Sequence, residues 1–310
     1  MVRGVSPPNR PPPLSDSPAD PPAAAESPAA VPAAPLPAGA EKALRDAVEV
    51  LEGRGGLRQI SDVLGVKLER AVDLLPEVAQ DRVEDVTRAS LKAALNVAVK
   101  TMDADGEAAS WDLSHKLAGA AVGAVGGAVG LPSALIELPL STVVMLRSVA
   151  DIARASGEDL DDLETRLECL NVFALGGGGA TVGGRSDGEN GEPADDGYDS
   201  AYFATRVVLA REVGAATKAI AARGLTDDAA SPVVKFLAKV AARYGVTVSE
   251  KLAAMAVPIL GAAAGAAINV AFTSRFQSVA RAHFAVRRLE REHGAAAVKA
   301  RYLELAKAAG

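Results

Sequence analysis

Two long apolar runs constrain the fold of this chain more than any other feature of its 310 residues. The first, LAGAAVGAVGGAVGLPSALIELPLSTVVML, extends from Leu117 to Leu146 and holds a single charged residue, Glu137. As one helix it would span about 45 Å, well beyond the ~30 Å hydrocarbon core of a bilayer. Pro132 and Pro139 each remove a backbone donor and crowd the preceding turn. We therefore expect the run to divide into two helices near Gly130–Pro132.

The second apolar run, LAAMAVPILGAAAGAAINVAF, extends from Leu252 to Phe272 and carries no charge. Glycines recur at four-residue intervals in both runs, at Gly119, Gly123 and Gly127 and again at Gly261 and Gly265. This spacing clears one face of a helix of side chains, so that another backbone can approach closely. The pattern predicts glycine-zipper packing of these helices.

Two interpretations of the apolar runs stay open. In the first, both runs form central helices of a soluble bundle, apolar all round because they are buried all round. In the second, they enter a bilayer as hairpin or re-entrant elements. Glu137 and Asn269 favour protein surroundings, because polar groups in lipid need partners.

The rest of the chain is also predicted to be helical, because apolar residues recur at three- and four-residue spacing and strand-like alternation is scarce. Three pairs, Asp81 with Glu84, Asp161 with Glu164 and Thr247 with Glu250, have capping-box spacing and predict helix starts. We predict an all-α, multi-helix bundle around the two Ala/Gly-rich helices. Its expected helices are 41–53, 58–75, 81–103, 111–130, 133–155, 161–175, 199–223, 231–244, 248–272 and 274–308, the last with a break near Gly294.

Composition divides the chain into a tail and a folded domain. Residues 1–40 hold 12 of the 18 prolines, which predicts a disordered tail. Residues 41–310 are expected to form one helical domain, interrupted by a flexible Gly-rich and acidic loop over 176–200. The net charge of −6 comes from the tail and this loop, since the remaining residues hold 30 basic and 30 acidic side chains.

The composition also argues against several classes of site. The single cysteine, Cys169, excludes a disulfide framework and a cysteine zinc site, and a reducing cytoplasmic compartment fits best. It lies in the apolar pattern LECLNVFAL and is predicted to be buried and inert. No domain is strongly basic, so we expect no nucleic-acid partner. The three histidines lack the spacing of a helical metal pair, and we expect neither a metal nor a cofactor.

One motif match points to an enzyme. The stretch GRSDG, Gly184–Gly188, fits the G-x-S-x-G pattern of hydrolases with Ser186 as nucleophile. That motif needs a strand before the serine and a helix after it, whereas glycine-rich and acidic residues flank Ser186. A hydrolase is therefore the weakest hypothesis, and we expect no catalytic residues.

Three blocks of the chain resemble the EcsC family of bacterial proteins. They are GLPSALIELPLSTVVMLRSVADIARASGEDL (Gly130–Leu160), YFATRVVLA (Tyr202–Ala210) and VPILGAAAGAAINVAFTSRFQSVARAHFAVRRLE (Val257–Glu290). With the intervening helices the resemblance covers roughly Leu44 to Glu290. The family is named for a protein encoded beside an ABC transporter. The resemblance implies a helical, membrane-associated protein and implies no reaction.

Polar residues within these blocks are candidates for a structural network or a small polar pocket, which stay as alternatives. They are Glu137, Arg147, Asp151, Tyr202, Arg206 and Asn269. Arg147 and Asp151 are four residues apart on one expected helix, so they can pair. A second group is basic and is predicted to face an anionic membrane if its members share one helix face. It consists of Arg275, Arg281, Arg287, Arg288 and Arg291.

Two functions follow as hypotheses. The first is a non-enzymatic EcsC-like protein in the cytoplasm, peripheral to the membrane or partly inserted in it, that assists a transport or secretion system. Its partners would be an anionic membrane surface or a membrane protein complex. The alternative is a soluble interaction module that recruits proteins through its proline-rich tail and acidic loop.

Overall fold

The computed structural model describes residues 36–53, 77–102, 131–177, 200–225, 228, 231–256 and 261–309, and every regular element among them is a helix. The predicted all-α fold is confirmed. The helices are α1 (Ala38–Glu52), α4 (Glu77–Thr101), α6 (Leu131–Ala155), α7 (Leu163–Gly176), α8 (Ala201–Arg223), α9 (Pro232–Ala256), α10 (Gly261–His293) and α11 (Ala295–Ala309).

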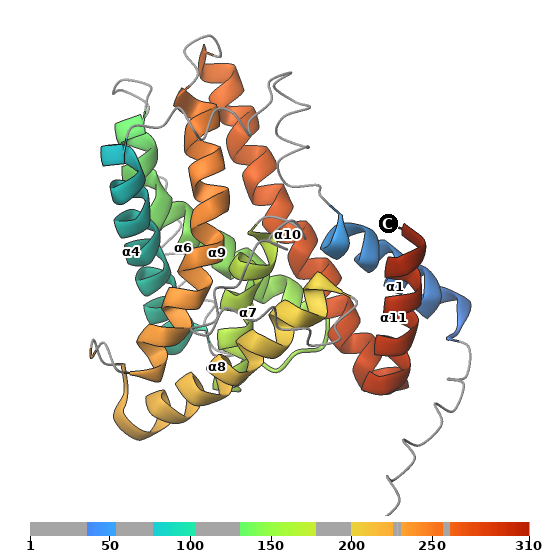
Figure 1. Ribbon diagram of the computed structural model, residues 1–310. Coiled ribbons are helices and arrows are strands. Elements are labelled where there is room, and N and C mark those ends of the chain that lie inside the picture. The colour runs from blue at the N-terminus through green and yellow to red at the C-terminus, as the bar shows by residue number, and fades with distance from the viewer. Residues whose placement is uncertain are drawn as a thin grey trace, which may run out of the picture. The chain divides into compact units, whose positions relative to one another are not determined.

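The longest helix, α10, lies at the centre of the packing. It contacts α1, α6, α7, α9 and α11, while α4 packs against α6 and α9 (Figure 1). The starts of α4, α6 and α10 and the end of α9 lie at the same end of this array (Figure 1). The described parts of the two apolar runs, in α6, α9 and α10, therefore lie at that end.

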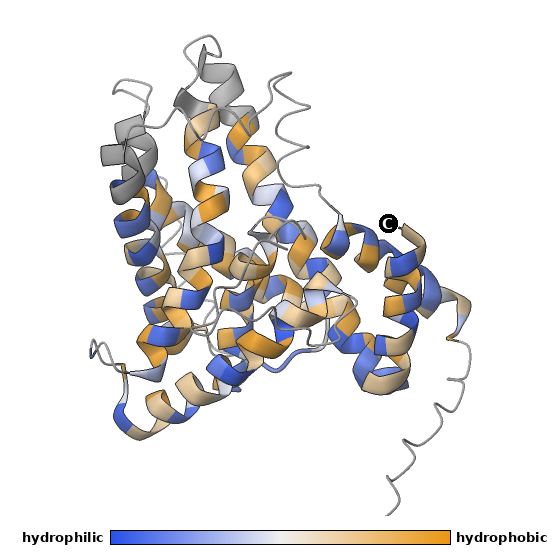
Figure 2. Ribbon diagram, in the orientation of Figure 1, coloured by the Kyte–Doolittle hydropathy of each residue, from blue (hydrophilic) through white to orange (hydrophobic). Residues whose placement is uncertain are grey.

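The outer helices are amphipathic. In α1 the residues Leu44, Ala47, Val48 and Leu51 are buried, which is the i, i+3, i+4, i+7 spacing of a single helix face. The coloured part of α4 also alternates between hydrophobic and hydrophilic residues (Figure 2). In α8 the buried positions recur at three- and four-residue spacing, at Tyr202, Thr205, Leu209, Val213, Ala216 and Ile220. Each helix therefore buries one face and leaves the other to solvent.

Local side chains set several helix ends. The Asp162 carboxylate accepts hydrogen bonds from the first-turn amides of α7, and the Ser200 hydroxyl accepts one from Phe203 N at the start of α8. Gly294, with a φ of 89°, separates α10 from α11, because a left-handed backbone favours glycine. The predicted break near Gly294 is confirmed.

The prediction for α9 was wrong in two respects. The helix continues from Pro232 to Ala256 without a break, so Thr247 and Glu250 lie inside it and do not form a capping box. The predicted helix 248–272 is instead divided, since α9 ends at Ala256 and α10 begins at Gly261. Pro258, which lacks a backbone donor, stands between the two helices in the sequence.

The first apolar run is described only from Leu131 onward, where α6 begins. The expected helices 58–75 and 111–130, the tail up to residue 35 and most of the 176–200 loop lie outside the described residues. Pro139 does not end α6, and the hydroxyl of Thr142 donates to the Leu138 carbonyl one turn earlier. None of the described helices is both long enough and apolar enough to cross a membrane.

Four aromatic rings meet where α7, α9 and α10 pack together. The Phe276 ring lies with its centroid 5.4 Å from that of Phe173, 5.5 Å from Tyr244 and 5.1 Å from Phe272. Gly176 lets this ring approach the α7 backbone, because a Cβ placed there would lie 2.5 Å from Phe276 Cε1. The close helix contact thus depends on a glycine outside the two predicted zippers.

We expect Gly176→Ala to lower the free energy of unfolding by about 1–3 kcal/mol, the usual effect of overpacking a filled core. The added methyl group would overlap a buried ring that its neighbours hold in place. Gly214→Ala in α8 is the matched control, because nothing lies within 4 Å of a Cβ there. That control should stabilise the protein by about 0.5–1 kcal/mol through helix propensity. Urea denaturation measures both changes, and similar behaviour of the two variants would refute the overlap.

Candidate functional site

The densest polar cluster lies where α7, α8 and the second half of α10 meet the loop between α6 and α7. Gly157, with a φ of 80°, turns the chain after α6, and the Glu158 amide closes this turn by donating to the Ala153 carbonyl at 3.1 Å. The turn places the Glu158 side chain beneath α10, where only 4% of it is exposed. A local glycine signal thus positions the central carboxylate of the cluster.

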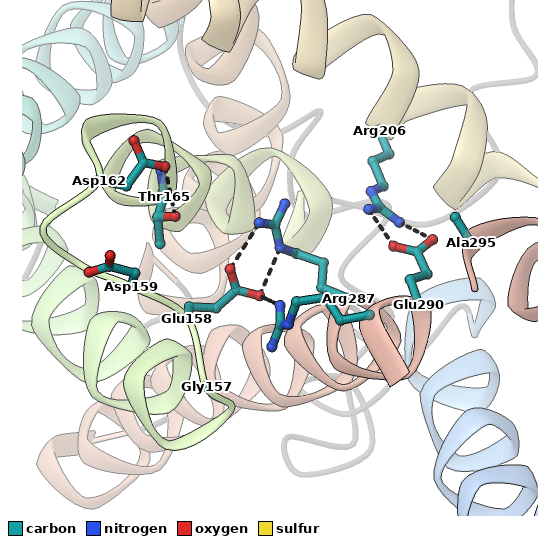
Figure 3. Close-up of a pocket in the computed structure, with 10 residues that line it drawn as sticks. Gly157, Glu158, Asp159, Asp162, Thr165, Arg206, Arg287, Glu290 and Ala295 are labelled. Carbon is teal, nitrogen blue, oxygen red and sulfur yellow. Dashed lines mark hydrogen bonds and ion pairs between the residues drawn. The ribbon is translucent and has the colours of Figure 1, made fainter. Parts of the chain in front are cut away.

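Glu158 is held by two arginines of α10 (Figure 3). Arg287 donates through Nε and Nη2 at 3.0 and 2.9 Å, and Arg291 also donates through Nη1. Burial alone would raise the pKa of Glu158, but the two guanidinium groups outweigh burial and lower it. The α6–α7 loop is therefore fastened to α10 by a fully ionised carboxylate.

A second bidentate pair joins α8 to α10. Arg206 donates to both oxygens of Glu290, each at 2.7 Å (Figure 3). Its guanidinium also lies 6.0 Å from the centroid of the Tyr202 ring. The bidentate Arg206–Glu290 contact combines opposite charges with two directional hydrogen bonds, so it fixes the register of α8 on α10.

A row of buried polar groups connects the two pairs. Tyr202 Oη lies 2.9 Å from His283 Nδ1, and His283 Nε2 lies 3.7 Å from Glu168 Oε2. Glu168 accepts a hydrogen bond from Asn171 Nδ2 at 2.9 Å. Arg287 Nη1, 4.0 Å from Glu168 Oε1, links the row to Glu158.

The charges in this row are well defined. Burial would raise the pKa of Glu168, but His283, Arg287 and Asn171, which face it, outweigh burial and lower it, so the group is a carboxylate. Burial lowers the pKa of His283, which is therefore neutral. We assign its proton to Nε2, which faces the carboxylate, and this leaves Nδ1 to accept from the Tyr202 hydroxyl.

The row does not resemble a reaction centre. Tyr202, His283 and Glu168 are at most 6% exposed, and burial raises the pKa of the Tyr202 hydroxyl. Cys169 beside them is fully buried, as predicted, and burial raises the pKa of its thiol. A reactant cannot reach these groups, so their arrangement favours a structural role.

An open pocket of about 500 Å³ adjoins the two ion pairs. Three arginines and four carboxylate side chains line it, and the arginines are already matched by Glu158 and Glu290. The full lining is Gly157, Glu158, Asp159, Asp162, Thr165, Arg206, Arg287, Glu290, Arg291 and Ala295. In the described part of the chain, no three His, Cys, Asp or Glu side chains are grouped so that they could hold a metal ion.

Only two of the six predicted polar residues, Tyr202 and Arg206, lie in this cluster. Arg147 and Asp151 do not form a close ion pair: Arg147 Nη2 donates to Thr101 Oγ1 at 3.0 Å, and Asp151 pairs with Arg154 at 2.9 Å. The charge of Asp151 still partly opposes the lowering of the Arg147 pKa by burial. The i, i+3 partner Arg154 competes for Asp151, and α4, which packs against α6, offers Arg147 the Thr101 hydroxyl.

The other two predicted polar residues lie closer to the apolar end. Glu137 Oε1 lies 3.9 Å from Lys251 Nζ, and buried Asn269 Oδ1 has no hydrogen-bond partner among the described residues. Of the predicted zipper glycines, Gly119, Gly123 and Gly127 lie outside the described residues. Gly261 and Gly265 lie in the first turns of α10, where only the backbone is described. Ser186 also lies outside the described residues, so the hydrolase hypothesis gains no support.

The five predicted basic residues do not share one face of α10. Arg275 and Arg287 turn inward, with Arg275 7% exposed and donating to the Val50 carbonyl of α1 at 3.2 Å. Arg291 is bound to Glu158. Arg281 and Arg288 lie on the exposed face, where Arg288 Nε is 3.8 Å from Glu292.

Sequence analysis missed most of the residues that form the cluster. Glu168 and Asn171 carried a local signal, since two polar residues three apart interrupt the apolar pattern LECLNVFAL. Nothing local indicated the partners of Glu158, His283 and Glu290, because these partners are about eighty or more residues away in the chain.

Comparison with known proteins gives one match. The model of the EcsC protein family matches residues 58–289, which is most of the chain and includes α4 to α9 and nearly all of α10. No curated protein and no solved structure matches the chain.

Proposed function

The chain belongs to the EcsC protein family, and from that premise we propose that it is a non-enzymatic helical protein that attaches to the cytoplasmic face of a membrane and assists a transport or secretion system. The absence of an accessible reactive group from the described cluster supports a non-enzymatic role. The membrane contact is proposed from the outer face of α10.

One stripe along α10 carries the proposal. Val270, Gln277, Arg281 and Arg288 are separated by seven, four and seven residues, so all four lie on one helix face. Val270 is 66% exposed, and Arg281 and Arg288 are exposed as well. The stripe thus changes from apolar to basic along the helix.

The neighbouring helix extends the apolar part of this stripe. Gln277 donates to Ser148 of α6 at 2.9 Å, and Val144, one turn before Ser148, is 43% exposed. The first 14 residues of α10 carry no charge, and the first 16 of α6 carry only Glu137. The two exposed valines, Val144 and Val270, therefore lie in two helix segments that carry almost no charge.

The spacing of the stripe suits a bilayer interface. Arg281 lies about 16 Å and Arg288 about 27 Å beyond Val270 along the helix axis, given a rise of ~1.5 Å per residue. A tilted α10 whose apolar start dips into the interface would place both arginines at the phosphate level. Each basic side chain near an anionic surface contributes about 1 kcal/mol to binding.

Vesicle flotation tests this function. We expect the wild-type protein to float with vesicles that contain phosphatidylglycerol and not with pure phosphatidylcholine. Arg281→Glu/Arg288→Glu should weaken binding by at least about 30-fold, given ~1 kcal/mol for each lost basic contact. Val270→Asp should weaken binding in high salt too, because the apolar contact is not screened.

The control reverses two exposed arginines on another helix. Arg211→Glu/Arg223→Glu in α8 changes the net charge by the same amount and should leave flotation unchanged. Equal losses in both double variants would show that only net charge matters. Failure of the wild-type protein to bind anionic vesicles would refute the proposal.

A further inference from the structure

A second set of charges lies apart from the polar cluster of α7, α8 and α10. It comprises Glu137 of α6, Glu250 and Lys251 of α9, and Arg275 of α10, and is called here the interior charge group. Glu250 is 4%, Lys251 2% and Arg275 7% exposed, whereas the Glu137 side chain is 40% exposed. All four lie in the halves of their helices that are nearer the apolar runs.

The interior charge group is poorly paired. Lys251 Nζ lies 3.9 Å from Glu137 Oε1 and 4.8 Å from the centre of the Phe272 ring. Arg275 bonds a neutral carbonyl, and its buried Nε has no partner among the described residues. Among the described residues, Glu250 has no hydrogen-bond partner and no ion-pair partner within 4 Å.

The surroundings of Glu250 are simple. Arg275 of α10 is the one described charged group that acts on its carboxyl. Lys251, next in sequence, pairs instead with Glu137 of α6. The described charges of α4, α7 and α8, which also pack against α9, do not contribute. The pKa of the Glu250 carboxyl is therefore set by two influences, burial and the opposing charge of the Arg275 guanidinium.

This environment moves the titration of Glu250 to neutral pH. Burial raises its pKa from 4.5 to about 7, and Arg275 only partly opposes the shift. Burial also lowers the pKa of Lys251 and of Arg275. By contrast, Glu158 has two arginine partners and a lowered pKa.

We propose that Glu250 makes the packing of α9 against α10 depend on a bound proton, so that the contact is tight when its carboxyl is neutral and loosens when it ionises. Loss of the proton leaves a weakly compensated charge inside the array, and separation of the two helices relieves it by admitting water. Loosening would expose Ile268 and Phe272, which are 1% exposed. The inference does not depend on membrane binding.

The sign follows from linkage. The packed state has the higher pKa, so it binds a proton that the separated state has already released. The contribution of the proton is complete below pH 4.5 and is lost as the pH rises to about 7. Above that pH the carboxyl is charged in both states, and the packing no longer responds.

Hydrogen exchange of the intact protein tests the switch. Peptides covering 248–254 and 268–276 would be compared between wild type and Glu250→Gln at the same pH, which cancels the intrinsic pH dependence of exchange. The wild-type-to-variant ratio of exchange rates should grow by about 30-fold between pH 5.5 and pH 8, because pH 5.5 is one and a half units below the pKa of about 7. The ratio of wild type to Glu84→Gln, a variant on the exposed face of α4, should not grow.

A direct titration gives the second measurement. Carbon-13 NMR of the glutamate carboxyls, with Glu250→Gln used to assign the signal, should show a midpoint near 7. A midpoint near 4.5, or an exchange ratio that does not change with pH, would overturn the proposal. Equal growth of the wild-type-to-Glu84→Gln ratio with pH would also overturn it.

Discussion

Glu158→Ala is expected to lower the free energy of unfolding by about 3–5 kcal/mol, the usual effect of removing one partner of a buried ion pair. The substitution leaves the guanidinium of Arg287, which is 23% exposed, and the Nη1 group of Arg291 without the Glu158 carboxylate. It also releases the α6–α7 loop from α10. Unfolding in guanidinium chloride, monitored by circular dichroism, measures the loss.

Glu164→Ala is the matched control for this prediction. Glu164 is exposed in the first turn of α7, six residues after Glu158, and its charge favours the helix N-terminus. Removing it should cost less than about 1 kcal/mol. If the two variants lost similar stability, the bidentate contact would contribute no more than a surface charge.

Phe276→Ala is the second large effect, with an expected loss of about 3–5 kcal/mol. The side chain is fully buried and touches the rings of Phe173, Tyr244 and Phe272, so truncation leaves a cavity in the aromatic centre. Val270→Ala on the same helix, at a position 66% exposed, should change stability by no more than about 0.5 kcal/mol.

Coupling to Gly176 makes this prediction specific. Because the Phe276 ring occupies the space that a Cβ of residue 176 would need, Gly176→Ala should cost less in the Phe276→Ala background than in the wild type. Thermodynamic double-mutant cycles measure this difference. Additive effects would show that the ring and the glycine do not share that space.

Helix positions were largely predictable because the signals for them are local. Apolar periodicity located α1, α4, α6, α7 and α8 to within a few residues, and Gly294 predicted the end of α10. The error in α9 is instructive, since a capping-box pattern at Thr247 lies inside a continuous helix. Such a pattern stabilises a helix start only if the chain before it is not already helical.

The candidate site was only partly predictable. Tyr202 and Arg206 were identified as polar residues in the blocks that resemble the EcsC family, and Glu168 interrupts an apolar run visibly enough to have been found. Their partners come from distant parts of the chain: 81 positions separate Tyr202 from His283, and 129 separate Glu158 from Arg287. Nothing in local spacing indicates which of the arginines of α10 turn inward.

By itself, the sequence determined that this chain is helical, that it belongs with the EcsC proteins and that its two apolar runs carry almost no charge. Those properties depend on composition and on periodicities of three to seven residues. A single stretch of chain contains such a period completely, so no distant contact is needed to recognise it. Only the tertiary structure decided that Arg275 and Glu250 are buried near each other, that Arg281 and Arg288 are exposed, and that Gly176 makes the close contact. Side-chain burial and charge pairing depend on which helix faces meet, and that choice is made by contacts across the whole fold.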